Sequence, residues 1–262
     1  LFTNERRLAA LQHELATARR IQASLLPHAD PRIAGLAFAA RYEPMTAVAG
    51  DIYDFIEVDE HRLAILVADV SGHGVPAALI ASLVKGAFRA QVDRLDRPDR
   101  VLAGMNQILT GELEANFVTA SCAFIDLERG IVRHASAGHP PLLARRAGAS
   151  AYEEANTGGI ILGQFPEAQY AYSEHDLGPG DRMVFYTDGL IEAENAAAEQ
   201  FGDASFQAFL TANHGASAAE LADGLIESVR RWGGAGANRP QDDDLTLIVI
   251  DVGPSAVPAT SS

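Results

Sequence analysis

The order of strand-like and helix-like segments is the feature that most restricts the fold of this chain. Apolar runs of strand length come in groups joined by short turns, and two helices follow each group. A parallel sheet needs strict alternation of strands and helices, so this order predicts an α+β fold with antiparallel sheets and helices outside them. We expect strands at residues 33–43, 51–58, 61–70, 117–126, 131–137, 141–145, 169–177, 182–187 and 245–252, and helices at 76–95, 98–113, 204–213 and 217–232.

The first 26 residues form a separate helical segment. Six residues, all apolar or small except Gln22, recur there at alternating spacings of three and four, the pattern of a coiled-coil seam: Leu8, Leu11, Leu15, Ala18, Gln22 and Leu25. We expect a linker helix at 1–26 that forms a homodimer, with an amphipathic helix packed on its own domain as the alternative. The main domain would then be 27–252, followed by a disordered tail at 253–262. Because the chain begins with Leu1 rather than methionine, we expect a further segment before it.

Composition argues against several classes of partner. The chain has 35 acidic and 20 basic residues, a net charge of −15. No basic stripe is present to neutralise phosphates, so nucleic acid is not an expected partner. No apolar stretch reaches the roughly 18 residues of a membrane-spanning helix. The lone cysteine, Cys122, rules out an internal disulfide and favours a cytoplasmic location.

Four aspartates lie where strand-like runs meet a glycine or a turn. Asp51 follows a glycine, Asp69 follows the apolar run LAILVA, Asp188 follows VFYT, and Asp243 precedes LTLIVIDV. Asp54, three residues after Asp51, falls on the opposite strand face. Carboxylates that converge at the end of a sheet repel one another unless a cation lies between them. All-oxygen ligands favour Mg²⁺ or Mn²⁺, so the set predicts a hard-metal site.

Two loops with glycine and histidine have open interpretations. In ADVSGHG, Gly72 and His73 are candidates for contacting a phosphate, although a loop histidine that caps the backbone is an equal alternative. Gly72, Gly74 and Ala77 also match a dinucleotide-binding pattern, but the required strand–helix–strand order is missing. His139, in the rigid bend of SAGHPPLL, is expected to be structural, with a position facing the site as the alternative.

Eight blocks together resemble a known family. IQASLLP, VAGDIYDF, ADVSGHGVPAAL, FVTASCAFID, HASAGHPPLL, GQFPEA, FYTDGLIEA and DDDLTL are similar, in that order, to the signature of the bacterial SpoIIE/RsbU-type serine/threonine phosphatases of the metal-dependent PPM (type 2C) superfamily. The resemblance covers roughly residues 17–252. It implies an αββα sandwich of two antiparallel sheets flanked by helices, and a metal-dependent phosphatase activity.

The resemblance also implies roles for individual residues. Asp51 would bridge two divalent cations, Mn²⁺ or Mg²⁺, and Asp188 and Asp243 would each bind one of them. Asp69 and the carbonyl of Val70 would be further ligands. The cations would activate a water that attacks phosphorus directly, without a protein nucleophile.

Two positions in these motifs leave a choice open. Asp243 and Asp244 are both candidates for the last ligand, and the spacing to Thr246 favours Asp243. Ala49 stands where the family usually has a glycine, and alanine fits only if its φ angle is negative.

By the same resemblance, the substrate would be phosphoserine or phosphothreonine on a STAS-domain anti-sigma-factor antagonist in a partner-switching pathway. A sensory domain would lie upstream of the linker helix. One alternative is a binding module with the same fold and no turnover, which retention of the four aspartates disfavours. The other is a nucleotide-handling enzyme, which the order of strands and helices disfavours.

Overall fold

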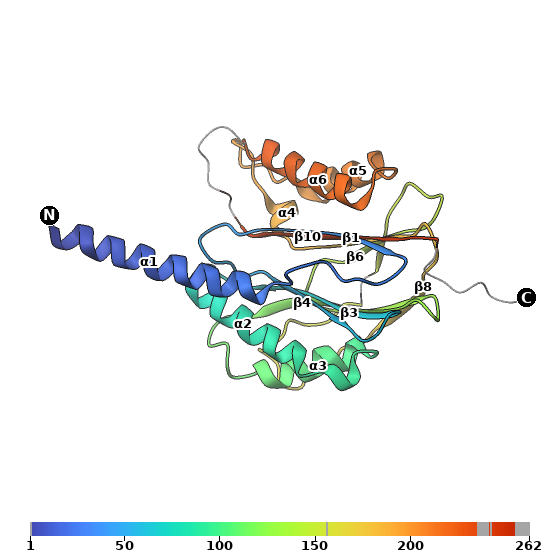
Figure 1. The fold of residues 1–262 in the computed structure, drawn as a ribbon, viewed down its shortest axis with the longest axis horizontal. Coiled ribbons are helices and arrows are strands. Elements are labelled where there is room, and N and C mark those ends of the chain that lie inside the picture. Colours follow the sequence, from blue (N-terminus) through green and yellow to red (C-terminus); the bar gives the residue numbers. More distant parts are fainter. Residues whose placement is uncertain (1, 156, 235–240, 242, 255–262) are drawn as a thin grey trace, which may run out of the picture.

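The computed structural model describes residues 2–155, 157–234, 241 and 243–254. Two five-stranded sheets face each other, with helices on both outer faces (Figure 1). The strand orders are β1-β10-β9-β6-β7 and β2-β3-β4-β5-β8, and all neighbouring strands within the sheets pair antiparallel. The predicted α+β sandwich is therefore confirmed.

The first sheet contains β1 (Leu36–Glu43), β6 (Leu142–Arg145), β7 (Glu153–Ala155), β9 (Arg182–Tyr186) and β10 (Leu245–Val252). The second sheet contains β2 (Ile52–Glu57), β3 (Arg62–Val70), β4 (Val118–Asp126), β5 (Ile131–Ala137) and β8 (Ser173–Asp176). The sequence did not predict β7, because its three residues EEA contain no apolar run.

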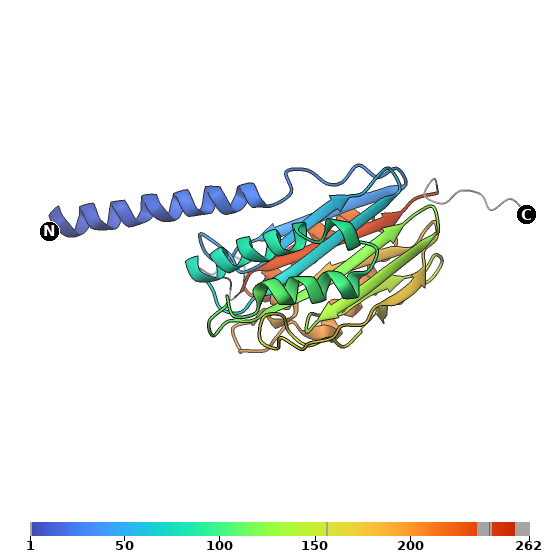
Figure 2. The ribbon, with the colours of Figure 1, turned by 90° about the horizontal axis from the view of Figure 1, so that it is seen from below.

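The helices are α1 (Phe2–Leu25), α2 (Val75–Arg89), α3 (Pro98–Leu109), α4 (Gly189–Glu192), α5 (Gly202–Ala212) and α6 (Ala218–Trp232), with a 3₁₀ turn at Val92–Arg94. Helices α2 and α3 lie side by side over the second sheet (Figure 2), and α5 and α6 cover the first. The helix expected at 76–95 ends earlier, at Arg89, and the one expected at 98–113 ends at Leu109.

Strand β3 shows why the run LAILVADV is apolar on both faces. Leu63, Ile65 and Val67 point between the sheets, whereas Leu66 and Ala68 pack beneath α2 and α3. Because side chains alternate along a strand, the odd-numbered residues of β3 all face the other sheet. This alternation continues to the end of the strand and directs its last carboxylate toward the other sheet.

Helix α1 projects beyond the sandwich, and its C-terminal turns lie beside α2 (Figures 1 and 2). The Lys85 ammonium of α2 donates to the carbonyl of Leu25 at the end of α1. Among the described residues, no helix is both long and apolar enough to cross a membrane. Most of the predicted tail, 255–262, lies outside the described residues.

Candidate metal centre

A row of polar residues crosses three strands at one end of the space between the sheets. Asp69 of β3 pairs with Thr119 of β4, and continuing the β2–β3 register by one residue places Asp51 opposite Asp69. Directly opposed residues point to the same face. That face is turned toward the other sheet, because Val67, two residues before Asp69, lies in the core between the sheets.

The other sheet holds Asp51 through two threonine hydroxyls. Thr187 Oγ1 and Thr246 Oγ1 donate to Oδ2 of Asp51 over 2.8 and 2.5 Å. The backbone N–H of Thr246 in turn donates to Thr187 Oγ1 (3.0 Å). Asp51 is 1% exposed, so the carboxylate is buried where the ends of the two sheets meet.

Asp244 fixes the turn that carries Asp51. Its Oδ1 accepts from the N–H of Met45 (2.6 Å), and its Oδ2 accepts from the N–H groups of Gly50 (2.7 Å) and Asp51 (3.5 Å). A carboxylate that accepts three backbone N–H groups has little capacity left for a cation. The neighbouring carboxylate of Asp243 accepts only from the N–H of Asp244 among the bonds described, so geometry and the Thr246 spacing both favour Asp243 as a ligand.

Two glycines allow the segments of the site to approach one another. A Cβ atom on Gly50 would lie 2.7 Å from the carbonyl oxygen of Val70, and one on Gly189 would collide with the carbonyl of Asp244. The turn after Asp188 therefore packs directly on the acidic segment before β10. Ala49 is not among the residues with positive φ, so alanine fits its position without backbone strain.

Burial raises the pKa values of all four predicted acids, and repulsion between carboxylates adds to the rise at Asp51, Asp69 and Asp243. Burial raises the pKa of Asp51 well above its ordinary range, and the charge of Asp69 raises it further. Burial, followed by the charge of Asp188, raises the pKa of Asp69 to about 7, and burial raises that of Asp243 to about 6. Asp188 also has a raised pKa because of burial.

The described ion pairs bring no lysine or arginine to any of these four carboxylates. Within the described residues, no ion pair neutralises their negative charge, which fits an external cation. In the part of the chain described, no three acidic, histidine or cysteine side chains already enclose a space for an ion. A cation would therefore have to draw the carboxylates closer together.

The loop between β3 and α2 borders this site. Gly72 and His73 are exposed there, and Ser71 anchors the loop through its N–H, which donates to the carbonyl of Phe117 (3.0 Å). Gly72 has a φ of 90°, a conformation that glycine adopts readily. The structure places both predicted phosphate-contact residues at the solvent edge of the centre, beside Val70.

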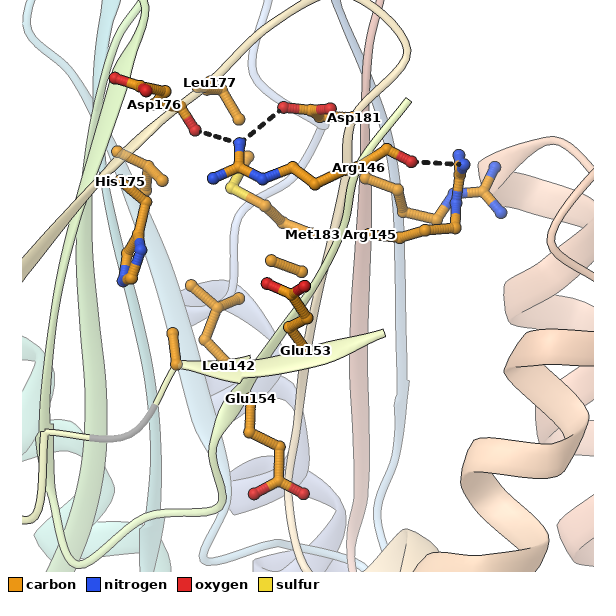
Figure 3. Close-up of a pocket in the computed structure, with 14 residues that line it drawn as sticks. Leu142, Arg145, Arg146, Glu153, Glu154, His175, Asp176, Leu177, Asp181 and Met183 are labelled. Atoms are coloured by element: carbon orange, nitrogen blue, oxygen red, sulfur yellow. Dashed lines mark hydrogen bonds and ion pairs between the residues drawn. The ribbon is translucent and has the colours of Figure 1, made fainter. Parts of the chain in front are cut away.

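A small cavity, drawn in Figure 3, lies at the opposite end of the sheets from the acidic cluster. It has a volume of about 50 Å³ and is lined by the first residues of β9, whereas the acidic cluster follows the last residue of that strand. Arg146 Nη1 donates to Asp181 Oδ2 (3.0 Å) and to the carbonyl of Asp176. Arg146 and Asp181 form the ion pair within this lining, whereas Arg182 pairs with Asp251 outside it.

The sandwich with a carboxylate cluster at one end belongs to a recognisable class of fold. The SiaA-PP2C domain of Pseudomonas aeruginosa superposes with a TM-score of 0.80 at 23% identity, over 94% of this chain and 98% of that domain. RsbX, solved in complex with magnesium, gives a TM-score of 0.61 at 17% identity, over 83% of this chain and 96% of RsbX. The chain has the PP2C-like fold.

Sequence comparison narrows the class to a family. Residues 59–253 match the profile of the Stage II sporulation protein E (SpoIIE) family, and the chain belongs to that family. Phosphoserine phosphatase RsbU of Bacillus subtilis (strain 168) is a homologue, 27% identical over 243 residues, which cover 92% of this chain and 70% of RsbU. The chain spans less than half the length of two further curated relatives.

Proposed function

We propose that this chain is a metal-dependent phosphatase that hydrolyses phosphoserine or phosphothreonine on a protein. The observation that carries the proposal is the convergence of Asp51, Asp69, Asp188 and Asp243, with raised pKa values and no neutralising cation from the described residues. The homology with a phosphoserine phosphatase supports the same activity.

Two divalent cations, Mn²⁺ or Mg²⁺, are the proposed cofactors. Asp51 would bridge them, and Asp69, the Val70 carbonyl, Asp188 and Asp243 would complete their protein ligands. Bound divalent cations supply a water of lowered pKa and offset charge on the phosphoryl oxygens. The magnesium in RsbX supports this choice of ion.

The protein's own contribution is to orient these ligands. Thr187 and Thr246 both donate to Oδ2 of Asp51, which leaves Oδ1 free of threonine donors. Asp244 holds the Gly50–Asp51 backbone, and the exposed Gly72 and His73 are placed to meet a phosphate at the solvent edge. No protein nucleophile is needed, because water attacks phosphorus directly.

The proposed substrate is a phosphorylated STAS-domain anti-sigma-factor antagonist in a partner-switching pathway, acting in the cytoplasm. The homology with RsbU, a phosphoserine phosphatase, supports phosphoserine as the group that is hydrolysed. The proposed organisation is a linker helix at 1–26 that dimerises and receives a signal from an upstream sensory domain, and a phosphatase domain at 27–252. A protein with this fold that binds a partner without turnover is the competing possibility.

The test is hydrolysis of phosphorylated STAS-domain proteins from the same genome with Mn²⁺. We expect release of phosphate that disappears with a chelator and in Asp51→Asn and Asp188→Asn. Binding of the phosphoprotein with no hydrolysis by the wild type would instead support the binding module.

The linker is tested by removing residues 1–18, which leaves Gln22 and its contacts in place. We expect the dimer to become a monomer and the phosphatase rate to change. If neither the mass in solution nor the rate changes, the proposed role of the linker is wrong.

A further inference from the structure

His139 is buried beside the row of polar residues that enters the metal centre. The residue is 5% exposed, and its ring Nδ1 lies 2.8 Å from Oγ1 of Thr119. Ser136 Oγ accepts from the N–H of His139 and donates to its carbonyl, both over 3.2 Å. These bonds fix the backbone of the bend, so the direction of the ring is determined by the fold.

The ring also faces the other sheet. Its Nε2 makes no hydrogen bond of good geometry within the described residues, yet it is buried. A backbone group of Tyr186 raises the pKa of the ring and must therefore be the carbonyl, an acceptor. Burial nevertheless lowers the pKa of His139 to about 3, so the ring is neutral. The Nε2–H tautomer fits this setting, and Nδ1 then accepts from the Thr119 hydroxyl.

The three threonines around the centre have different partners. Thr187 and Thr246 donate to Asp51, whereas Thr119, the direct cross-strand neighbour of Asp69, is engaged by His139. Among the hydrogen bonds described, no threonine hydroxyl donates to Asp69. A hydroxyl that donated to Asp69 would occupy one of its lone pairs, as Thr187 and Thr246 already do at Oδ2 of Asp51, and would leave fewer for a cation.

We propose that His139 is a positioning residue for the metal centre, which holds the Thr119 hydroxyl away from Asp69 and so keeps that carboxylate free to bind a cation. This inference rests on the proposed metal-dependent function. It gives His139 a role beyond the structural one that its bend predicts.

The chain offers a matched control pair. His134 Nε2 lies 2.9 Å from Ser121 Oγ, His134 is also fully buried, and its Nδ1 also makes no hydrogen bond within the described residues. Both control residues face the space between the sheets, but Ser121 lies two residues further along β4 than Thr119. Replacing His134 therefore removes a buried contact similar to the one that is lost on replacing His139. The two pairs differ in their distance from Asp69, because Thr119 is its cross-strand neighbour and Ser121 is not.

The experiment measures Mn²⁺ affinity by calorimetry, with thermal unfolding as the check on folding. His139→Phe should bind Mn²⁺ about 10-fold more weakly, because it releases the Thr119 hydroxyl toward Asp69. Thr119→Val should stay near the wild type, and the double variant His139→Phe/Thr119→Val should recover the affinity of Thr119→Val. His139→Asn, which keeps a polar atom near Nδ1, should also stay near the wild type.

Recovery in the double variant is the decisive readout, because a merely structural histidine would not regain function when a second buried group is removed. The inference is overturned if the double variant remains as weak as His139→Phe, or if His134→Phe loses as much affinity. It is also overturned if His139→Phe binds Mn²⁺ normally. If the variants show the expected Mn²⁺ affinities but the wild type hydrolyses no phosphoprotein, only the proposed function is overturned. If the wild type binds no Mn²⁺, the proposed function and the role of His139 are both overturned.

Discussion

Gln22 binds both sides of the backbone of Ala49 through its side-chain amide. Nε2 donates to the Ala49 carbonyl (2.6 Å), and Oε1 accepts from the Ala49 N–H (2.9 Å). The last turns of α1 are thereby fixed to the residue two positions before Asp51. Gln22 is 7% exposed, so these bonds are shielded from water. At this position of the seam, the helix contacts its own domain.

Gln22→Ala should destabilise the protein by about 1–3 kcal/mol, because two buried backbone groups of Ala49 lose their partners. Amide hydrogens of residues 49–51 should also exchange faster. Urea unfolding and hydrogen exchange followed by mass spectrometry measure the two effects. Gln12→Ala, at an exposed position of the same helix, is the control. Equal behaviour of the two variants would show that the Gln22 bonds do not hold this turn in solution.

Asp243 and Asp244 should respond differently to replacement by asparagine. Asp244→Asn disturbs three hydrogen bonds to the backbone at residues 45, 50 and 51, and should cost about 1–3 kcal/mol of stability. Asp243→Asn should keep that stability and lose Mn²⁺ affinity, because it removes a carboxylate proposed as a ligand. Unfolding curves and calorimetry on both variants give the comparison. If Asp244 were the ligand and Asp243 held the backbone, Asp244→Asn would lose Mn²⁺ affinity and Asp243→Asn would lose stability.

The succession of strands and helices along the chain, and the placement of acids at strand ends, could be predicted from sequence because each depends on local patterns. The apolar run before Asp69 marked a strand covered on both faces, and an acid that directly follows such a run must lie at the strand's end. Alternation of side chains then placed Asp54 on the opposite face from Asp51, as the structure shows: Asp54 pairs with Arg89 of α2.

The contacts between distant segments could not be predicted in this way. Thr187 and Thr246 are adjacent to recognised motifs, but their donation to Asp51 depends on which strands face each other across the sandwich. The sequence showed Gln22 only as one position of a helical repeat. Nothing in that spacing predicts that its side chain bonds to the backbone of Ala49. The choice between Asp243 and Asp244 likewise requires the position of the Gly50 turn.

Replacing the two aspartates of GDIYD by asparagine should change the stability of the metal-free protein differently. Asp54 has a side chain 1% exposed, and its two oxygens accept from Arg89 Nε (2.6 Å) and Nη2 (2.7 Å). Asp54→Asn should cost about 2 kcal/mol, less than the ~3–5 kcal/mol of a fully buried pair, because Arg89 is 48% exposed. Asp51→Asn should leave stability unchanged or raise it, because it removes a charge beside Asp69.

Thermal unfolding with a chelator separates these cases, and repeating it with Mn²⁺ adds a second contrast. Mn²⁺ should stabilise Asp54→Asn as it does the wild type, by binding only the folded state, and should not stabilise Asp51→Asn. A loss of chelated stability in Asp51→Asn as large as that in Asp54→Asn would show that Asp51 is a structural carboxylate.

His134 should make stability depend on pH below neutrality. Burial lowers its pKa to about 3 in the folded protein, with the charge of His175 as a smaller cause. Between that value and the ordinary pKa of about 6.5, the unfolded chain takes up a proton that the folded protein excludes. The contribution of His134 to stability is therefore fully present at pH values above the ordinary pKa, and it is lost as the pH falls below that value.

The clean measurement is the difference between the wild type and His134→Phe, because the acids of the metal centre titrate in both proteins and cancel. Between pH 7.5 and 5.5, the wild type should lose about 1.4 kcal/mol more unfolding free energy than the variant. His61→Asn, at an exposed position, should run parallel to the wild type and serves as the control. Parallel curves for His134→Phe and the wild type would mean that His134 accepts its proton in the folded state, and hence that water reaches the layer between the sheets.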